Sequence, residues 1–171
     1  MYAPSTINAE EIKKLKEKGK IMPTPNPEFI AELKRIVNTS PYPSHMSMRL
    51  AEIDIDKADI ELDIGTCHMQ PFGIVHGGVL ATLIDTATFW AAFMRIPEDA
   101  GLVNIDLKLN YLKPVADGRL IAKGRAIRSG KSISYAEAGV LDSAGELVAH
   151  GTSTLMTLPG KGLKMKAAKF L

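Results

Sequence analysis

This sequence of 171 residues has almost no cysteine, no long apolar run and no excess of one charge. Its one cysteine, Cys67, cannot form a disulfide within the chain, and four histidines add little material for a structural zinc site. The 21 basic residues offset 19 acidic residues to a net charge of +2, which does not indicate a nucleic-acid binder. What is present is ordinary for one globular domain, with 46% hydrophobic residues.

No segment of the sequence is apolar for long enough to cross a membrane. The most apolar stretch, 79–94, contains Asp85 and is followed by Arg95, whereas a membrane span needs about 20 apolar residues. The first residues lack the apolar region that a secretory signal requires. We therefore expect a protein of the reducing cytoplasm.

The chain divides into three predicted parts. Residues 1–39 form an N-terminal helical extension, in which we expect a short charged helix over 10–18 and a second helix over 28–37. Residues 40–158 form the functional body. Residues 159–171 form a basic tail, which we expect to be solvated because it carries four lysines and little periodicity.

Alternation of apolar and polar residues predicts six strands around one long helix. The helix is expected over 77–95, and the strands over 48–56, 58–64, 103–111, 119–129, 132–142 and 146–157. Within the third strand, Asn104 falls among the polar residues, so it could simply face solvent. One helix among about six strands indicates an antiparallel sheet wrapped around that helix, an α+β arrangement.

The predicted helix over 77–95 is apolar nearly all the way round. Its second face, opposite the face expected to pack on the sheet, has Asp85 as its only charge. Such a helix is buried on nearly every side, and one sheet covers one side only. The simplest candidate to cover the other side is the same helix of a second copy of the chain. Asp85 is then either paired with a basic side chain from elsewhere or used in chemistry.

Gly77 and Gly78 fall where this helix begins, directly after His76. Glycines there allow a substrate close to the free backbone N–H groups, and the helix dipole favours a developing oxyanion; a tight turn is the plainer alternative. Gly77 and Asp85 are about 12 Å apart along a helix, too far to act on one carbon. Two antiparallel copies would bring Gly77 of one near Asp85 of the other, which predicts a site shared across a dimer interface.

The segment from Gln70 to Asp85, with His76, Gly77 and Gly78 between them, resembles the hotdog-fold acyl-CoA thioesterases. Its pattern is similar to the phenylacetate-degradation and 4-hydroxybenzoyl-CoA-thioesterase-like group, over about residues 40–157. The resemblance implies a hotdog fold that hydrolyses an acyl or aryl thioester of coenzyme A. It implies no metal and no cofactor beyond the coenzyme A of the substrate, and a homodimer or a tetramer built from dimers.

The resemblance also implies a role for each matched residue. The Gly77 N–H polarises the thioester carbonyl, while Asp85 of the partner subunit is the general base for water or a nucleophile that forms an anhydride. Gln70 holds the carbonyl or the water, and His76 supports the thioester end. Weaker matches imply substrate contacts for Asn104, Arg128, Gly130, Lys131 and Ser132. Gly78, at the helix start, and Phe89, on the same side of the helix as Asp85, are further candidates for substrate contact.

Alternatives stay open for some of these residues. The turn from Arg128 to Ser132 resembles the stretch that approaches the nucleotide of coenzyme A, but an ordinary hairpin turn explains it equally well. Phe89 could line an acyl pocket or pack at the dimer interface. The sequence does not identify the acyl group.

Two other functions are compatible with the same fold. A hydratase or dehydratase of acyl thioesters uses a histidine with an acidic residue, which His68 and Asp85 could imitate. However, the sequence contains neither the Asp-x4-His segment of hydratases nor the His-Phe-Pro-Gly segment of dehydratases. A non-catalytic acyl-CoA sensor is the second alternative, and the presence of both Asp85 and Gln70 argues against it.

Overall fold

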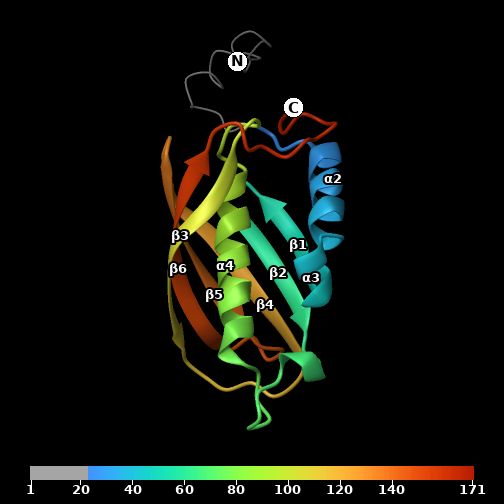
Figure 1. Cartoon of the computed structure of the whole chain (residues 1–171), viewed down its shortest axis with the longest axis vertical. Coiled ribbons are helices and arrows are strands. Elements are labelled where there is room, and N and C mark those ends of the chain that lie inside the picture. Colours follow the sequence, from blue (N-terminus) through green and yellow to red (C-terminus); the bar gives the residue numbers. More distant parts are fainter. Residues whose placement is uncertain (1–22) are drawn as a thin grey trace, which may run out of the picture.

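The computed structural model describes residues 23–171, and Figure 1 shows how their elements are arranged. Two helices come first, α2 (Pro27–Asn38) and α3 (Pro41–His45), followed by strands β1 (Met48–Asp54) and β2 (Lys57–Asp63). A 3-10 turn, η1 (Thr66–His68), leads into the long helix α4 (Gly77–Phe93). The remaining strands are β3 (Gly101–Tyr111), β4 (Arg119–Ser129), β5 (Ile133–Leu141) and β6 (Leu147–Leu158).

The six strands form one antiparallel sheet in the order β1-β2-β4-β5-β6-β3. Figure 1 shows the sheet curving around α4. The predicted α+β hotdog arrangement is therefore confirmed, and each predicted strand agrees with the observed one to within about two residues at either end. Turn glycines set several of these limits, since Gly118 and Gly145 have φ angles of 87° and 79°, which favour glycine.

The core lies between the sheet and one face of α4. Leu83, Ile84 and Ala87 on this face are completely buried. The helix approaches β4 closely at Gly124, where an added side chain would lie 2.2 Å from the carbonyl oxygen of Ala87. Gly124 therefore sets the depth at which α4 sits in the curved sheet.

The other face of α4 is only partly covered within one chain. Thr82, Asp85 and Phe89 on this face are half-buried, and Asp85 is the one charged residue of the helix. A strip with a single charge that stays half-open to water is unusual for a surface helix, which normally carries polar residues there. This strip is what the sequence predicted a second copy would cover.

The described part of the N-terminal extension lies beside β1. The predicted helix over 28–37 is confirmed as α2, which begins where the Asn26 side chain accepts a hydrogen bond of 3.0 Å from the Glu28 N–H. The short helix α3 was not predicted, and it begins at Pro41 with a second proline, Pro43, in the same turn. Proline is tolerated in the first turn of a helix. The helix predicted over 10–18 lies outside the described residues.

The C-terminal segment is not solvated throughout, contrary to the prediction. Lys169 is only 1% exposed, and its Nζ donates hydrogen bonds to the carbonyl oxygens of Phe93 (3.2 Å) and Ile96 (2.8 Å). The same ammonium lies 4.5 Å from the centroid of the Phe93 ring. Lys169 therefore closes the C-terminal end of α4, where helix carbonyls lack partners within the helix. The number of lysines in the tail could not reveal that one of them points inward.

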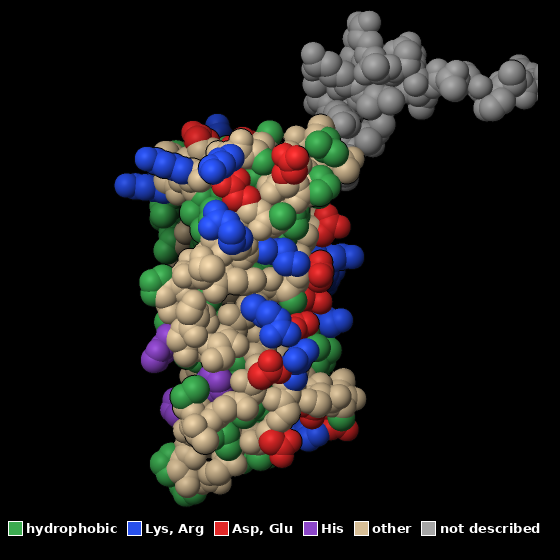
Figure 2. All heavy atoms as spheres, turned by 90° about the vertical axis from the view of Figure 1, so that its right-hand side faces the viewer, with side chains coloured by type: hydrophobic (Ala, Val, Ile, Leu, Met, Phe, Trp, Pro, Cys, Tyr) green, Lys and Arg blue, Asp and Glu red, His purple; other side chains and the backbone are tan. Residues whose placement is uncertain are grey.

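The surface on the α2 side of the molecule carries charges of both signs. Figure 2 shows Lys and Arg side chains interspersed with Asp and Glu side chains on this face. Ion pairs of the described residues include Lys34–Glu52 and Arg95–Asp56. Within residues 23–171, no helix has the length and apolar character required to span a membrane.

Candidate active site

Asp85 lies at the middle of the half-covered face of α4 and contacts one polar side chain from the sheet. Asn104 on β3 donates a hydrogen bond from Nδ2 to Oδ1 of Asp85 at 2.5 Å. The same Nδ2 lies 3.3 Å from the carbonyl oxygen of Asp85. Asn104 therefore fixes the direction in which the carboxylate points.

Burial controls the acidity of Asp85. It raises the pKa of this carboxyl above its ordinary value, and the hydrogen bond from Asn104 opposes that shift. No charged side chain of residues 23–171 contributes to the shift. The salt bridge considered as an alternative for Asp85 is thus not formed within the described chain. A carboxylate with a raised pKa and no cation beside it has the properties of a general base.

A β-bulge explains how Asn104 reaches Asp85. The pairing of β3 with β6 shifts between Asn104 and Asp106, so Ile105 is the extra residue and is exposed. Because of this bulge, Asn104 shares the inner face of the sheet with Leu107, although simple alternation placed the two on opposite faces. The solvent-facing interpretation of Asn104 is wrong for this reason. Bulges commonly re-aim a side chain in this way beside functional sites.

The first turn of α4 is built from His76, Gly77 and Gly78. His76 is the N-cap residue, and its Nδ1 accepts a hydrogen bond of 2.9 Å from the Gly78 N–H. The His76 carbonyl oxygen accepts another from the Val79 N–H at 2.9 Å. No described residue accepts a hydrogen bond from the Gly77 N–H. That N–H is therefore the donor at the helix start that a ligand could use.

Side chains of the protein itself fill the space beside both glycines. A methyl group on Gly77 would lie 2.9 Å from Cζ of Tyr111, and one on Gly78 would lie 2.9 Å from Nδ1 of His76. Sequence reasoning attributed this space to the substrate and missed Tyr111. The signal available was the alternation of β3, which places Tyr111 on the apolar side of the strand.

Gln70 lies at the start of the tight turn that precedes α4. Its N–H donates to the Ile74 carbonyl oxygen at 2.8 Å, and its own carbonyl oxygen accepts from the Gly73 N–H at 3.0 Å. The side chain of Gln70 is half-buried, whereas Phe72 at the tip of the turn is 86% exposed. Figure 1 shows this turn at the end of the molecule where α4 begins.

The two remaining residues of interest before α4 have structural or exposed positions. His68 is 2% exposed, its Nδ1 accepts from the Gly65 N–H at 2.9 Å, and its Nε2 bonds the Met46 carbonyl oxygen at 3.0 Å. Both ring nitrogens are therefore engaged with the backbone. Cys67 is exposed and has no disulfide partner.

Several predicted substrate contacts lie at the opposite end of α4. Arg128, Gly130, Lys131 and Ser132 are all exposed, in and beside the turn from β4 to β5. Just before this turn, the Ala126 N–H bonds the carbonyl oxygen of Asp56, a residue that also pairs with Arg95 beyond the end of α4. The turn is thus far from Gly77 within one chain. An antiparallel partner helix would place it at the same end as the partner's first turn.

Phe89 belongs to an aromatic cluster one turn beyond Asp85. Its ring centroid lies 4.9 Å from that of Trp90, and the Trp90 ring lies 5.0 Å from that of Phe93. Phe89 and Trp90 are half-buried, whereas Phe93 is buried. The cluster therefore presents apolar surface beside Asp85 on the half-covered face of α4, the open strip of this helix.

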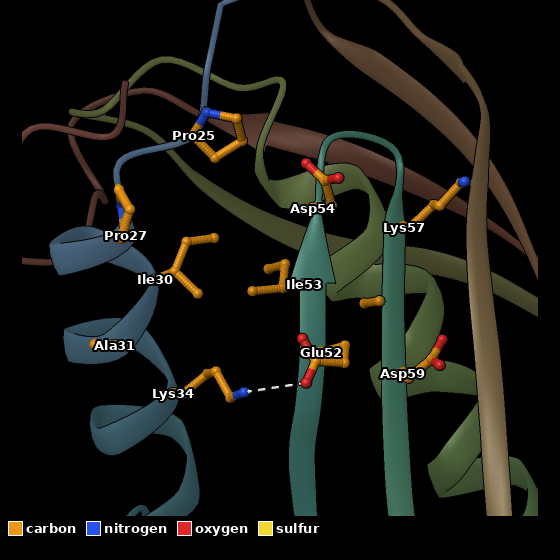
Figure 3. A pocket seen from close by; sticks show the side chains of 11 residues that line it. Pro25, Pro27, Ile30, Ala31, Lys34, Glu52, Ile53, Asp54, Lys57 and Asp59 are labelled. Atoms are coloured by element: carbon orange, nitrogen blue, oxygen red, sulfur yellow. Dashed lines mark ion pairs between the residues drawn. The ribbon is translucent and has the colours of Figure 1, made fainter. Parts of the chain in front are cut away.

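A large groove elsewhere on the described surface does not coincide with these residues. It lies between α2 and the strands β1 and β2 (Figure 3). Ile30 and Ile53 face it from its two sides, and an ion pair of 3.6 Å joins Lys34 to Glu52. None of the predicted site residues lines this groove. Residues 23–171 also contain no group of three His, Cys, Asp or Glu side chains that could hold a metal ion.

The region that holds Gly77, Asp85 and Asn104 matches a known protein family. The thioesterase superfamily is matched by residues 72–149. A protein of Halobacterium salinarum that carries an esterase name is 42% identical over 81 residues, which are 46% of this chain and 53% of that protein. Mouse acyl-coenzyme A thioesterase 13 is 27% identical over 101 residues, 58% of this chain and 71% of that enzyme.

A solved structure extends the similarity to most of the body. The thioesterase family protein of Silicibacter pomeroyi is 26% identical, with a TM-score of 0.70 over 77% of this chain and 99% of that one. The chain spans only 65% and 53% of the length of the first two curated relatives that it matches. Residues 72–149, the part that matches the thioesterase superfamily, hold α4 with strands β3, β4 and β5, and the chain has the hotdog fold of this solved structure.

Proposed function

We propose that this protein hydrolyses an acyl or aryl thioester of coenzyme A. The observation that carries the proposal is Asp85, a half-buried carboxylate that no described cation pairs, oriented by Asn104 on an otherwise uncharged strip of α4. The thioesterase names of the relatives, including an acyl-coenzyme A thioesterase, support the choice of substrate class. The exposed cysteine suits a reducing compartment, and we propose the cytoplasm as the location.

The proposed site is shared between two copies of the chain. Gly77 and Asp85 are separated by about 12 Å along one helix, so one copy cannot supply both to a single thioester. An antiparallel pair of α4 helices brings the first turn of one copy toward Asp85 of the other. Each dimer then has two sites, and the half-covered strip of α4 becomes buried. A dimer of such dimers is compatible with the same arrangement.

In the proposed reaction, Asp85 removes a proton from water while the water oxygen attacks the thioester carbon. The electron pair of the C=O bond moves onto the carbonyl oxygen, where the Gly77 N–H of the other copy stabilises the negative charge. The C=O bond then re-forms and the C–S bond breaks. The thiolate of coenzyme A leaves and takes the proton from Asp85, so the products are the acid and the free thiol.

The neighbouring residues hold the substrate in this scheme. Gln70 bonds the carbonyl or the attacking water, and His76 fixes the first turn of α4 and supports the thioester end. Phe89 and its aromatic neighbours provide apolar surface for the acyl or aryl group. The Arg128–Ser132 turn of the copy that provides Asp85 approaches the nucleotide of coenzyme A.

One structural observation disfavours the hydratase alternative. His68, the histidine that could have paired with Asp85, is buried and uses both ring nitrogens on backbone groups. It therefore has no nitrogen available for proton transfer to a carbon of the substrate. A hydratase built on this pair would need His68 to break both bonds.

The direct experiment measures free thiol released from short, medium, long and aryl esters of coenzyme A. We expect turnover by the unmodified protein and a loss of roughly 10²–10⁴-fold in Asp85→Asn, the range for a lost general base. Asp106→Asn, an exposed carboxylate on the outer face of β3, is the matched control and retains activity. An active Asp85→Asn enzyme would contradict the assignment of the base, and release from no ester would contradict the function.

A further inference from the structure

Tyr111 lies against the first residue of α4. A methyl group built on Gly77 would lie 2.9 Å from Cζ and 3.0 Å from the hydroxyl oxygen of Tyr111. Real Cβ atoms do not come this close to other atoms, so the phenol occupies the place of a side chain at position 77. Any larger residue at position 77 would therefore displace the Tyr111 ring, whether or not a substrate is bound.

The β3 strand aims Tyr111 toward the site. Tyr111 pairs with Ala149 and Asn104 pairs with Leu155, and both partners are buried on the inner side of the sheet. Tyr111 and Asn104 thus share a face of β3, and each contacts α4, one at Gly77 and the other at Asp85. The same strand therefore supplies one polar side chain to each half of the proposed shared site.

The phenol of Tyr111 is open to a ligand. The residue is 57% exposed, although it is a large aromatic at the end of an inward-facing row. No group of residues 23–171 forms a hydrogen bond with its hydroxyl. A phenol donor without an internal partner thus lies beside the Gly77 N–H, the backbone donor at the helix start that is also without a described acceptor.

We propose that Tyr111 is a catalytic residue whose hydroxyl donates a hydrogen bond to the thioester carbonyl oxygen, next to the Gly77 N–H. The inference rests on the proposed thioesterase function and adds a second donor to its oxyanion site. A carbonyl oxygen has two lone pairs, so it accepts from a backbone amide and a phenol at once. The bond strengthens as negative charge develops on that oxygen, which lowers the barrier more than it aids ground-state binding.

The first test separates turnover from binding in Tyr111→Phe. The variant keeps the ring against Gly77 and removes only the hydroxyl. We expect kcat to fall by roughly 10- to 100-fold, at or below the lower end of the range for a lost oxyanion donor, while KM changes little. Tyr135→Phe, a half-exposed tyrosine on the outer face of β5, is the matched control. An unchanged kcat in Tyr111→Phe would overturn the proposal.

A binding test checks that the hydroxyl meets the carbonyl oxygen itself. Two unreactive probes differ at that atom: a ketone analogue in which CH₂ replaces the thioester sulfur, and an S-alkyl thioether of coenzyme A without a carbonyl. We expect Tyr111→Phe to weaken binding of the ketone by about 2- to 10-fold, typical of one hydrogen bond, and to leave the thioether unaffected. Equal weakening of both probes would overturn the contact with the carbonyl.

A third variant, Gly77→Ala, tests the same hydroxyl by displacing the Tyr111 ring. Gly77→Ala keeps the backbone N–H and pushes the phenol away, so we expect a loss in kcat similar to that in Tyr111→Phe. The double variant then loses little more than either single variant, whereas independent roles would multiply the losses. Gly65→Ala is the control, because its added methyl lies 3.8 Å from the nearest atom of His68. If the unmodified protein releases no thiol, the proposed function fails; if only these variants behave as the unmodified protein does, Tyr111 alone is wrongly assigned.

Discussion

The two ends of α4 are finished in opposite ways. At the C-terminal end, Lys169 folds back from the end of the chain and donates to two backbone carbonyl oxygens. At the N-terminal end, the His76 side chain accepts a hydrogen bond from the Gly78 N–H, and the His76 carbonyl oxygen accepts one from the Val79 N–H. The Gly77 N–H has no described acceptor. The C-terminal end of α4 is thus sealed, in the sense that a side chain of the same chain binds the carbonyl oxygens there. The N-terminal end keeps one N–H donor available to a ligand.

This difference shows how one helix can serve stability and chemistry separately. A sealed helix end satisfies its polar groups and adds to the free energy of folding. An end with a free N–H forgoes part of that gain but can bind a developing negative charge. Variants at the sealed end are therefore expected to change stability, whereas variants of Asp85, Asn104 and Tyr111 are expected to change turnover first.

The largest expected effect on folding comes from breaking the sealed end. Lys169→Ala leaves the Phe93 and Ile96 carbonyl oxygens without their buried donor, and we expect it to lower the free energy of unfolding by about 2–4 kcal/mol. Urea unfolding of the variant and of Lys164→Ala, an exposed lysine of the same segment, measures this. Equal stabilities of the two variants would show that the seal contributes nothing.

Lys169 also makes the stability of the folded protein depend on pH. Burial lowers the pKa of Lys169 to about 8, below the ordinary value of 10.5 for a lysine. Between these values the unfolded chain binds more protons than the folded chain, so the stability rises as pH increases from about 8 to 10.5. We expect Lys169→Ala to remove this rise.

An intermediate effect is expected at the middle of the open strip. Asn104→Ala removes the hydrogen bond that lowers the pKa of Asp85, so burial then raises that pKa further. Asp85 acts as a base in its ionised form, so activity is lost as pH falls through its pKa. We expect the acid limb of the kcat/KM profile to move to higher pH, because the hydrogen bond that opposed the effect of burial is lost. Asn110→Ala on the outer face of β3 is the control, and an unmoved limb would contradict the role of Asn104.

The smallest effect is expected from the N-cap of α4. His76→Ala removes the acceptor of the Gly78 N–H and lowers stability by about 1 kcal/mol. His76→Asn supplies a good N-cap side chain and restores that stability. If both variants unfold at the same urea concentration as the unmodified protein, the ring does not act as a cap.

The sequence was sufficient for the fold because the patterns involved are local. Alternation defined the strands, and the apolar run of α4 with its single charge indicated both a buried helix and a need for a second cover. The irregularity that mattered for the site was the bulge at Ile105, which moved Asn104 to the inner face. One inserted residue reverses the side of every residue before it, and alternation alone does not reveal where that occurs.

The contacts that the sequence did not reveal join distant positions. Lys169 reaches Phe93 across 76 residues, and Tyr111 meets Gly77 through the folding of β3 beside the start of α4. From the sequence alone, Lys169 was one of several lysines in the tail, and Gly77 was a residue that lets a substrate approach the backbone. Only the packed structure shows that Lys169 seals a helix and that Tyr111 fills the space beside Gly77.

The most direct test of the account is activity restored in a mixed dimer. Asp85→Ala and Gln70→Ala, each inactive alone, are combined and the dimers that contain one copy of each are isolated. If Asp85 and Gln70 come from different copies, one of the two sites in such a dimer is intact. The account therefore predicts thiol release at up to about half of the rate of the unmodified dimer. Verified mixed dimers that release no thiol would contradict the shared site.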